Sequence, residues 1–292
     1  MIDRAPLPAE LHALFPDGAA GQSTLSVPLP PGRLIVPAGD GEGHGGRDGD
    51  GGTPVMWLSD GPAPAGLWEQ LQREHPRSGL WPLLLEQPAG EREFRPWATG
   101  ELHPALASPP DSHDPSALLR GWWESPAVAR PDAPGRTEER LVMLEPYGAE
   151  WPGLAPSPRP SEEDEDPDSA AAEVARWLLH HDAGHRIGLV RAGSGAEALA
   201  VCGWRAAGDR DTGELAAVVR SWEQRFGARV VEVSPSGMRL STTVRLDDRA
   251  EALPIAAEHV AFCPDTVFRG LESLTDYAEE VLLELCWSFW WH

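Results

Sequence analysis

The sequence predicts a protein of the α/β (α+β) class, in which a mixed β-sheet C-terminal domain flanked by helices follows a smaller α+β N-terminal domain. Three observations lead to this prediction. Apolar runs of strand length alternate with segments whose apolar residues fall at helical spacing. Hydrophobic residues make up 41% and charged residues 24% of the 292 residues, as in globular proteins. A proline-rich acidic stretch, residues 152–170, interrupts the pattern and marks a linker between two domains.

The N-terminal domain, residues 1–151, is expected to hold short elements separated by long loops. Residues 38–52 are almost entirely Gly, Asp and Glu with few apolar side chains, so we expect a disordered loop there. His75-Pro76 is expected to end a helix, because the residue before a proline disfavours helical dihedral angles. The expected helices cover 8–15, 65–74 and the segment that begins at Asp114-Pro115; the expected strands cover 25–36 (broken by prolines), 54–58, 80–85 and 141–144.

The C-terminal domain, residues 171–292, shows the more regular pattern. Residues 212–226 place five apolar side chains on one helical face, and Gly227 follows at the C-terminal cap. Asp247 or Asp248 with Glu251 predicts a capped helix start, although Pro254 favours a later one. The other expected elements are helices over 171–180 and toward Phe262, a further helix before the last strand, and strands over 187–191, 198–204, 229–233, 238–244 and 287–291.

Composition and charge exclude several classes of function. A formal net charge of -22 repels phosphate backbones and anionic lipid, so nucleic acid and membranes are not expected partners. The chain contains no lysine and no asparagine, which removes Schiff-base chemistry and a P-loop lysine. Its three cysteines lack CxxC spacing, and neither a signal peptide nor a membrane span is apparent. We expect a cytoplasmic protein without a cofactor.

Four sequence blocks in the C-terminal domain resemble one known family. In chain order they are Gly203-Trp204, Trp222-Glu223-Gln224-Arg225-Phe226-Gly227-Ala228, Ala257-Glu258-His259 with Phe262-Cys263-Pro264-Asp265, and Trp287-Ser288-Phe289-Trp290-Trp291. In this order they resemble the bacterial domain-of-unknown-function family 4253 over about residues 171–292. Trp57 to Asp60 and His75 to Pro82 are similar to the N-terminal region of longer actinobacterial members. The family implies no activity.

Three residues near the end of the predicted helix are the candidate catalytic set. His259 and Cys263 are four residues apart, so a continuous helix would place them on one face, with Asp265 nearby. This spacing suits a thiolate–imidazole pair. The favoured alternative is that Cys263 is a small core residue and His259 a satisfied partner at the helix end.

Histidines and tryptophans supply the other candidate sites. His181 and His185 have metal-ligand spacing, but Gly184 between them and the attraction of a helix C-terminus for histidine weaken a metal site. Trp204, Trp287 and Trp290 are the candidate ligand-binding residues, since an aromatic-lined pocket holds a planar ligand or a peptide. The favoured alternative for the last strand is core packing on both faces, as in a central strand.

Two functional hypotheses follow from the sequence. The first is a non-catalytic, immunity-like or regulatory component that binds another protein. The negative charge is compatible with a basic partner, but the favoured alternative is that it forms a solvated acidic surface. The alternative is an enzyme or small-ligand-binding protein that uses an inter-domain cleft near His259, Cys263 and Asp265.

Overall fold

A single mixed sheet organises the fold. The computed structural model describes residues 5–38, 52–87, 90, 93–128, 136–158, 165–205, 210–268 and 273–291. Within them seven strands pair in the order β1-β2-β4-β3-β5-β6-β7. The strands are β1 Gly32–Ile35, β2 Met56–Ser59, β3 Leu80–Leu85, β4 Arg186–Arg191, β5 Arg229–Val233, β6 Gly237–Ser241 and β7 Cys286–Trp290. The α+β class with a mixed sheet is confirmed.

Strands from both predicted domains interleave in this sheet. β4 lies between β2 and β3 and is antiparallel to each, with Leu189 opposite both Trp57 and Pro82. β3 and β5 are the one parallel pair among the described strands. The predicted division at residues 152–170 is therefore not confirmed, because one sheet crosses it. The predicted loop over 38–52 lies, apart from its two end residues, outside the described residues.

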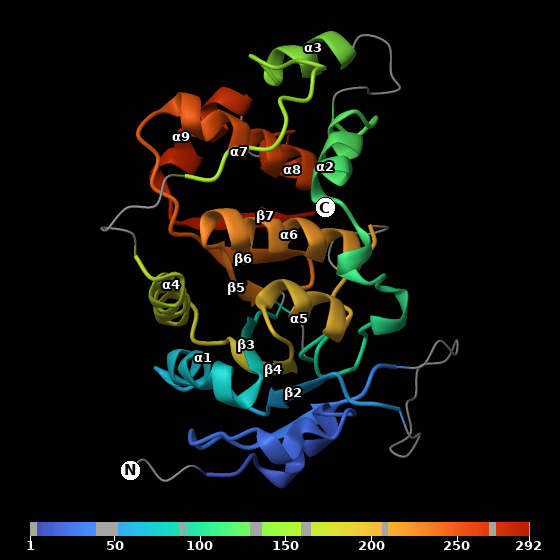
Figure 1. Ribbon diagram of the computed structural model, residues 1–292, viewed down its shortest axis with the longest axis vertical. Helices are drawn as coiled ribbons and strands as arrows, with labels where there is room; N and C mark the ends of the chain where they lie inside the picture. The colour runs from blue at the N-terminus through green and yellow to red at the C-terminus, as the bar shows by residue number, and fades with distance from the viewer. Residues whose placement is uncertain are drawn as a thin grey trace.

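Helices cover both faces of the sheet and extend beyond one end of it (Figure 1). α1 and α4 pack on one face, α5 and α6 lie on the other, and α7, α8 and α9 lie beyond β7. The α-helices are α1 Leu67–Ser78, α2 Pro115–Trp123, α3 Arg136–Met143, α4 Pro167–His181, α5 Gly195–Cys202, α6 Thr212–Phe226, α7 Arg249–Phe262, α8 Asp265–Phe268 and α9 Leu274–Leu283. In the described parts of the chain, four 3₁₀ helices cover Ala9–Leu14, Ala19–Gln22, Pro104–Leu106 and Pro110–Ser112.

Each face of the sheet buries its own hydrophobic core. Under α1 and α4, Trp68 and Leu178 pack with Leu84 of β3. Under α5 and α6, Leu199 and Trp222 pack with side chains of β3, β5, β6 and β7. Fully burying one such large apolar side chain contributes about 1.5–3 kcal/mol, so these layers supply most of the stabilisation.

Side-chain caps explain where many helices begin and end. The N-cap side chain of each accepts a backbone N–H two or three residues further on, which satisfies one of the unpaired donors of the first turn. These N-caps are Asp114, Asp166, Ser194, Asp211, Asp248 and Ser273. Gly79, Gly203 and Gly227 end helices in the left-handed conformation that glycine adopts without strain.

Two predicted strands are helical in the structure. Residues 198–204 belong mostly to α5, because Ser194 caps a helix that runs through an alanine-rich stretch and Gly203 ends it. Residues 141–144 lie at the end of α3 and in the turn after it. In both cases a short apolar run predicts a strand, although its length and composition also suit a buried helix.

Two prolines do not limit helices as the sequence predicted: Pro76 does not end α1, and Pro254 does not delay the start of α7. α1 continues through Pro76 to Ser78, and α7 begins at Arg249 with Pro254 inside it. A proline removes one helical hydrogen bond, and here the capping interactions and the buried faces outweigh that loss. α4 begins at Pro167 rather than at residue 171, so the end of the predicted linker is helical.

The last strand lies at the edge of the sheet and not in its interior. β7 pairs with β6, from Ser241 opposite Cys286 to Gly237 opposite Trp290. Trp287 and Phe289 are buried whereas Ser288 between them is exposed, so one face of β7 packs on the core. The expectation of core packing on both faces was wrong.

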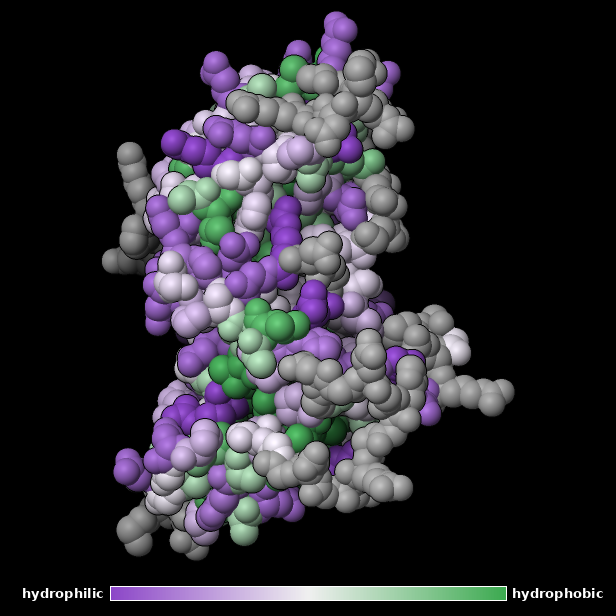
Figure 2. Space-filling view, turned by 90° about the vertical axis from the view of Figure 1, so that its right-hand side faces the viewer, coloured by the Kyte–Doolittle hydropathy of each residue, from purple (hydrophilic) through white to green (hydrophobic). Residues whose placement is uncertain are grey.

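The surface view in Figure 2 shows hydrophilic residues interrupted by small hydrophobic patches, without one continuous apolar band. No helix within the described residues has the length and apolar character needed to cross a bilayer.

Candidate functional site

Three of the four family-like sequence blocks meet in one buried aromatic cluster, and Trp204 of the remaining block is connected to it through Trp291. Trp222 of α6 stacks on Phe289 of β7 with ring centroids 5.3 Å apart and an interplanar angle of 17°. Edge-on contacts join Trp222 to Trp287, His259 and Phe262 at 5.8, 5.0 and 4.8 Å. Each such aromatic pair contributes about 0.5–1.5 kcal/mol to stability beyond the effect of burial. The contacts between the blocks therefore form a shared structural centre.

His259 lies fully buried inside this cluster. Its Nδ1 is 3.0 Å from the hydroxyl of Tyr277, and its Nε2 has no hydrogen-bond partner among the described residues. Burial, with a smaller contribution from the charge of Arg225, lowers the pKa of His259 to about 3. The imidazole is therefore neutral at physiological pH.

The thiol of Cys263 does not hydrogen-bond the imidazole of His259, although the two residues share the backbone bond that closes α7. Cys263 caps the end of α7, and its Sγ donates to the carbonyl of Trp290 at 3.0 Å. Burial raises the pKa of the Cys263 thiol to about 11, which keeps the sulfur protonated. Asp265 is the first residue of α8 and is half-buried. The candidate catalytic residues are thus close in sequence, but the thiol and the imidazole have different partners.

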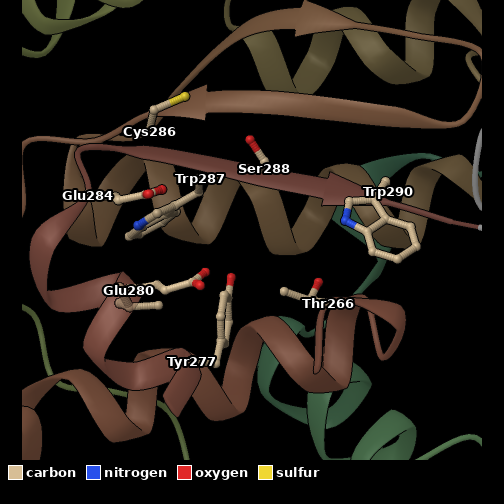
Figure 3. A pocket seen from close by; sticks show the side chains of 9 residues that line it. Thr266, Tyr277, Glu280, Glu284, Cys286, Trp287, Ser288 and Trp290 are labelled. Atoms are coloured by element: carbon tan, nitrogen blue, oxygen red, sulfur yellow. The ribbon is translucent and has the colours of Figure 1, made fainter. Parts of the chain in front are cut away.

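A pocket of about 210 Å³ opens beside the aromatic cluster, between β7 and the helices α8 and α9. Figure 3 shows Thr266, Tyr277 and Glu280 extending from these helices toward β7. The lining residues are Thr266, Tyr277, Glu280, Val281, Glu284, Cys286, Trp287, Ser288 and Trp290. Because Tyr277 lines the pocket and contacts His259, it connects the pocket to the buried imidazole.

Two carboxylates give the pocket its electrostatic character. Glu280 and Glu284 are four residues apart at the end of α9, and both are exposed. Partial burial, followed by the charge of Glu284, raises the pKa of Glu280. An anionic pocket rimmed by indole and phenol rings has the composition of sites that hold cations.

The predicted ligand-binding tryptophans separate into two groups. Trp287 and Trp290 line the pocket, as Figure 3 shows. Trp204 is buried elsewhere: its Nε1 donates to the carbonyl of Ser234 at 2.8 Å, and its ring meets Trp291 edge-on. The pocket lies within the C-terminal half and not between the two predicted domains.

Of the nine lining residues, the sequence indicated only Trp287 and Trp290, and three of those it missed carry the polar chemistry of the pocket. These are Tyr277, Glu280 and Glu284. The sequence did contain a signal for the two glutamates, because acidic side chains near a helix C-terminus interact unfavourably with the helix dipole. Their proximity to β7 follows from chain folding and not from any local pattern.

His181 and His185 do not face a common site. The exposed His181 bonds the carbonyl of Trp177 through Nδ1 and packs on its ring. His185 is 2% exposed, with Nδ1 2.8 Å from the carbonyl of Asp182 and Nε2 3.4 Å from Oε1 of Glu232. No group of three or more potential metal ligands occurs in the described parts of the chain.

A second polar cluster surrounds Glu232 on the opposite face of the sheet. Arg239 donates to Glu232 at 2.5 Å, and Glu86 lies close enough to interact with it. Burial opposes the charged forms, but the mutual hydrogen bonds and charges outweigh it, so the pKa of Glu232 is lowered and that of His185 raised. The cluster connects β5, β6 and the start of β4 through ion pairs and hydrogen bonds.

Fold and pocket together define an α+β protein whose distinctive C-terminal feature is an acidic, aromatic-lined pocket at a sheet edge. Residues 186–292 match the family model described as "Domain of unknown function (DUF4253)". The resemblance seen in the sequence is thereby confirmed for this region, with its start at 186 rather than at about 171. No curated protein and no solved structure matches the chain.

Proposed function

We propose that the protein is a non-catalytic binding component, immunity-like or regulatory, that engages a basic partner protein at the corner where α9 meets β7. One observation supports this most strongly. Leu283 and Leu285, next in sequence to the lining residues Glu284 and Cys286, have side chains that are 79% and 42% exposed. Exposed apolar side chains beside a polar pocket are typical of protein-binding surfaces.

The charge of the chain supports a basic partner. With a net charge of -22, long-range attraction would increase the rate at which a basic protein meets this surface and would repel acidic ones. The two leucines would then supply the contact energy that an exposed ion pair lacks.

The chemistry of the buried residues supports a non-catalytic role. A nucleophilic cysteine reacts as its thiolate and needs an adjacent base. Cys263 is buried and protonated. His259 lies in an aromatic cluster, and its low pKa means that its imidazole binds protons weakly. Neither residue lines the pocket.

Site-directed photo-crosslinking in extracts of the native host tests this function. A crosslinking amino acid at Leu283 should capture a basic protein, whereas the same group at the exposed Leu106 should not capture it. The crosslink should disappear in the Glu280→Gln, Glu284→Gln double variant. The proposal fails if position 283 captures no protein, or if both positions capture the same set.

Small-ligand binding or catalysis is the alternative function, and one observation favours it. Tyr277 connects the pocket to a buried histidine, an arrangement that can orient a hydroxyl toward a ligand. Native mass spectrometry of the purified protein distinguishes this alternative: a small molecule retained by the protein and released in a Tyr277→Phe variant would support it. Protein free of any such molecule, together with an intact crosslink at position 283, would exclude it.

A further inference from the structure

The end of α9 departs from a rule that most of the described α-helices follow, although α5 and α8 also lack a basic residue in the last turn. A helix C-terminus carries partial negative charge and is stabilised by basic side chains. α1, α4, α6 and α7 each have a histidine or arginine in the last turn. α9 has none there, and instead places Glu279 and Glu280 in its last turns and Glu284 at its C-cap.

Only part of this negative charge is balanced within the described chain. Glu279 pairs with Arg249. For Glu280 and Glu284 no ion pair occurs among the described residues, and both line the pocket. Like charges four residues apart destabilise a helix. A cation held between them would remove this repulsion, and a local arrangement that lowers stability is often found at a binding site.

A buried donor supplies a second and independent observation. Trp287 is 2% exposed and lines the pocket, yet its Nε1 has no hydrogen-bond partner among the described residues. Figure 3 shows its ring on the pocket side of β7, near Glu284 and Tyr277. Buried polar groups are nearly always hydrogen-bonded in native proteins. The unpaired N–H indicates an acceptor that arrives with the ligand, such as a peptide carbonyl.

We propose that this pocket binds the guanidinium group of an arginine side chain in an extended segment of the basic partner. Glu280 and Glu284 accept the guanidinium N–H groups, and Trp287 Nε1 donates to a carbonyl of the same segment. The source of the arginine rests on the function proposed above. The volume of 210 Å³ corresponds to roughly seven water molecules, which suits one planar head group and not a folded element.

The aromatic walls favour guanidinium over ammonium. A guanidinium is planar and weakly hydrated, stacks on aromatic rings and offers paired N–H groups to carboxylates. Trp287, Trp290 and Tyr277 provide such rings. An ammonium is a compact, strongly hydrated charge and would gain less from them.

Short peptides test this assignment without knowledge of the partner. Three capped tripeptides with Gly before and Leu after a central residue would be titrated into the full-length protein, the central residue being arginine, lysine or citrulline. Citrulline keeps the size of arginine without its charge. We expect the arginine peptide to bind best, and the Trp287 indole N–H resonance, assigned with Trp287→Phe, to shift on binding.

Matched variants localise the interaction. Glu280→Gln and Glu284→Gln should each weaken the arginine peptide by about fivefold, the effect of one exposed ion pair. Glu173→Gln, the same change at an exposed position of α4, should leave affinity unchanged. The assignment is wrong if citrulline binds as well as arginine, if lysine binds better, or if Glu173→Gln weakens binding equally.

The peptide and crosslinking experiments separate this inference from the proposed function. An arginine peptide that does not bind, with an intact crosslink at position 283, overturns the guanidinium site and leaves the binding function standing. A peptide that binds normally, with no protein captured at position 283, overturns the function and leaves the guanidinium site standing.

Discussion

Arg225 of α6 donates hydrogen bonds to both carboxylate oxygens of Glu258 of α7, at 2.8 and 2.5 Å. Glu258 is fully buried and also accepts from the backbone N–H of Ala155 and from Nε1 of Trp222, at 2.6 and 2.8 Å. One side chain thus joins two helices to the segment that precedes α4. Because all the donors converge on one carboxylate, its charge is stabilised in a site closed to water.

Removing this charge should strongly destabilise the protein. Glu258→Gln leaves the Arg225 guanidinium without its anion, and breaking a buried pair in this way costs about 3–5 kcal/mol. Urea denaturation would measure the loss, with Glu173→Gln as the control that changes stability by less than about 0.5 kcal/mol. A loss below about 1 kcal/mol would mean that the pair is far more hydrated than its burial indicates.

The buried histidine predicts a dependence of stability on pH. Because the pKa of His259 falls from 6.5 to about 3 on folding, the unfolded chain binds the extra proton between these values. The contribution of His259 to the free energy of unfolding is therefore fully present above pH 6.5. It is lost as the pH falls, at up to about 1.4 kcal/mol per pH unit.

A His259→Gln variant provides the control for this prediction, because glutamine can still bond Tyr277 but does not titrate. The difference in unfolding free energy between wild type and variant should shrink from pH 6.5 to pH 4.5. His185, whose pKa is raised, is present in both proteins and cancels in the difference. A difference that does not vary with pH would show that His259 is accessible to protons in the folded state.

Native cysteines should react very slowly with iodoacetamide. Burial raises the pKa of Cys202 and Cys286 to about 12 and that of Cys263 to about 11. At pH 7.5 the thiolate fraction of each is then on the order of one in a thousand or less, against several per cent in denatured protein. Mass spectrometry of alkylated protein with and without urea would measure this. Rapid native labelling of Cys263 would restore it as a candidate nucleophile.

Binding of the arginine peptide should depend on pH through Glu280. Its carboxylate attracts a cation only when deprotonated, and partial burial with the charge of Glu284 raises its pKa. Affinity should therefore be full at neutral pH and fall, on acidification, at a higher pH than for an ordinary glutamate. Titrations across pH 4–7 would detect this step. It should be absent in Glu280→Gln, and its persistence there would assign the proton to another group.

Sequence patterns correctly predicted the helices and strands whose ends depend on neighbouring residues in the chain. The helix over 212–226 was correct to the residue, because a regular apolar face and Gly227 both indicated it, and Asp211 caps its start in the structure. The strands over 229–233 and 238–244 were also predicted and form the antiparallel pair β5 and β6, although β6 ends at Ser241. The edge position of β7 did not, because strand order depends on contacts between distant segments. For the same reason, the sequence indicated Trp287 and Trp290 as ligand-binding residues but not the α9 carboxylates opposite them.

The position of β4 has a consequence for protein synthesis. β2 and β3 leave the ribosome early, but the strand that fills the space between them is more than a hundred residues further on. Until β4 emerges, both strands expose unpaired backbone edges that could join to other nascent chains. This sheet therefore cannot fold domain by domain during translation. It can be completed only after the second half of the chain has been synthesised.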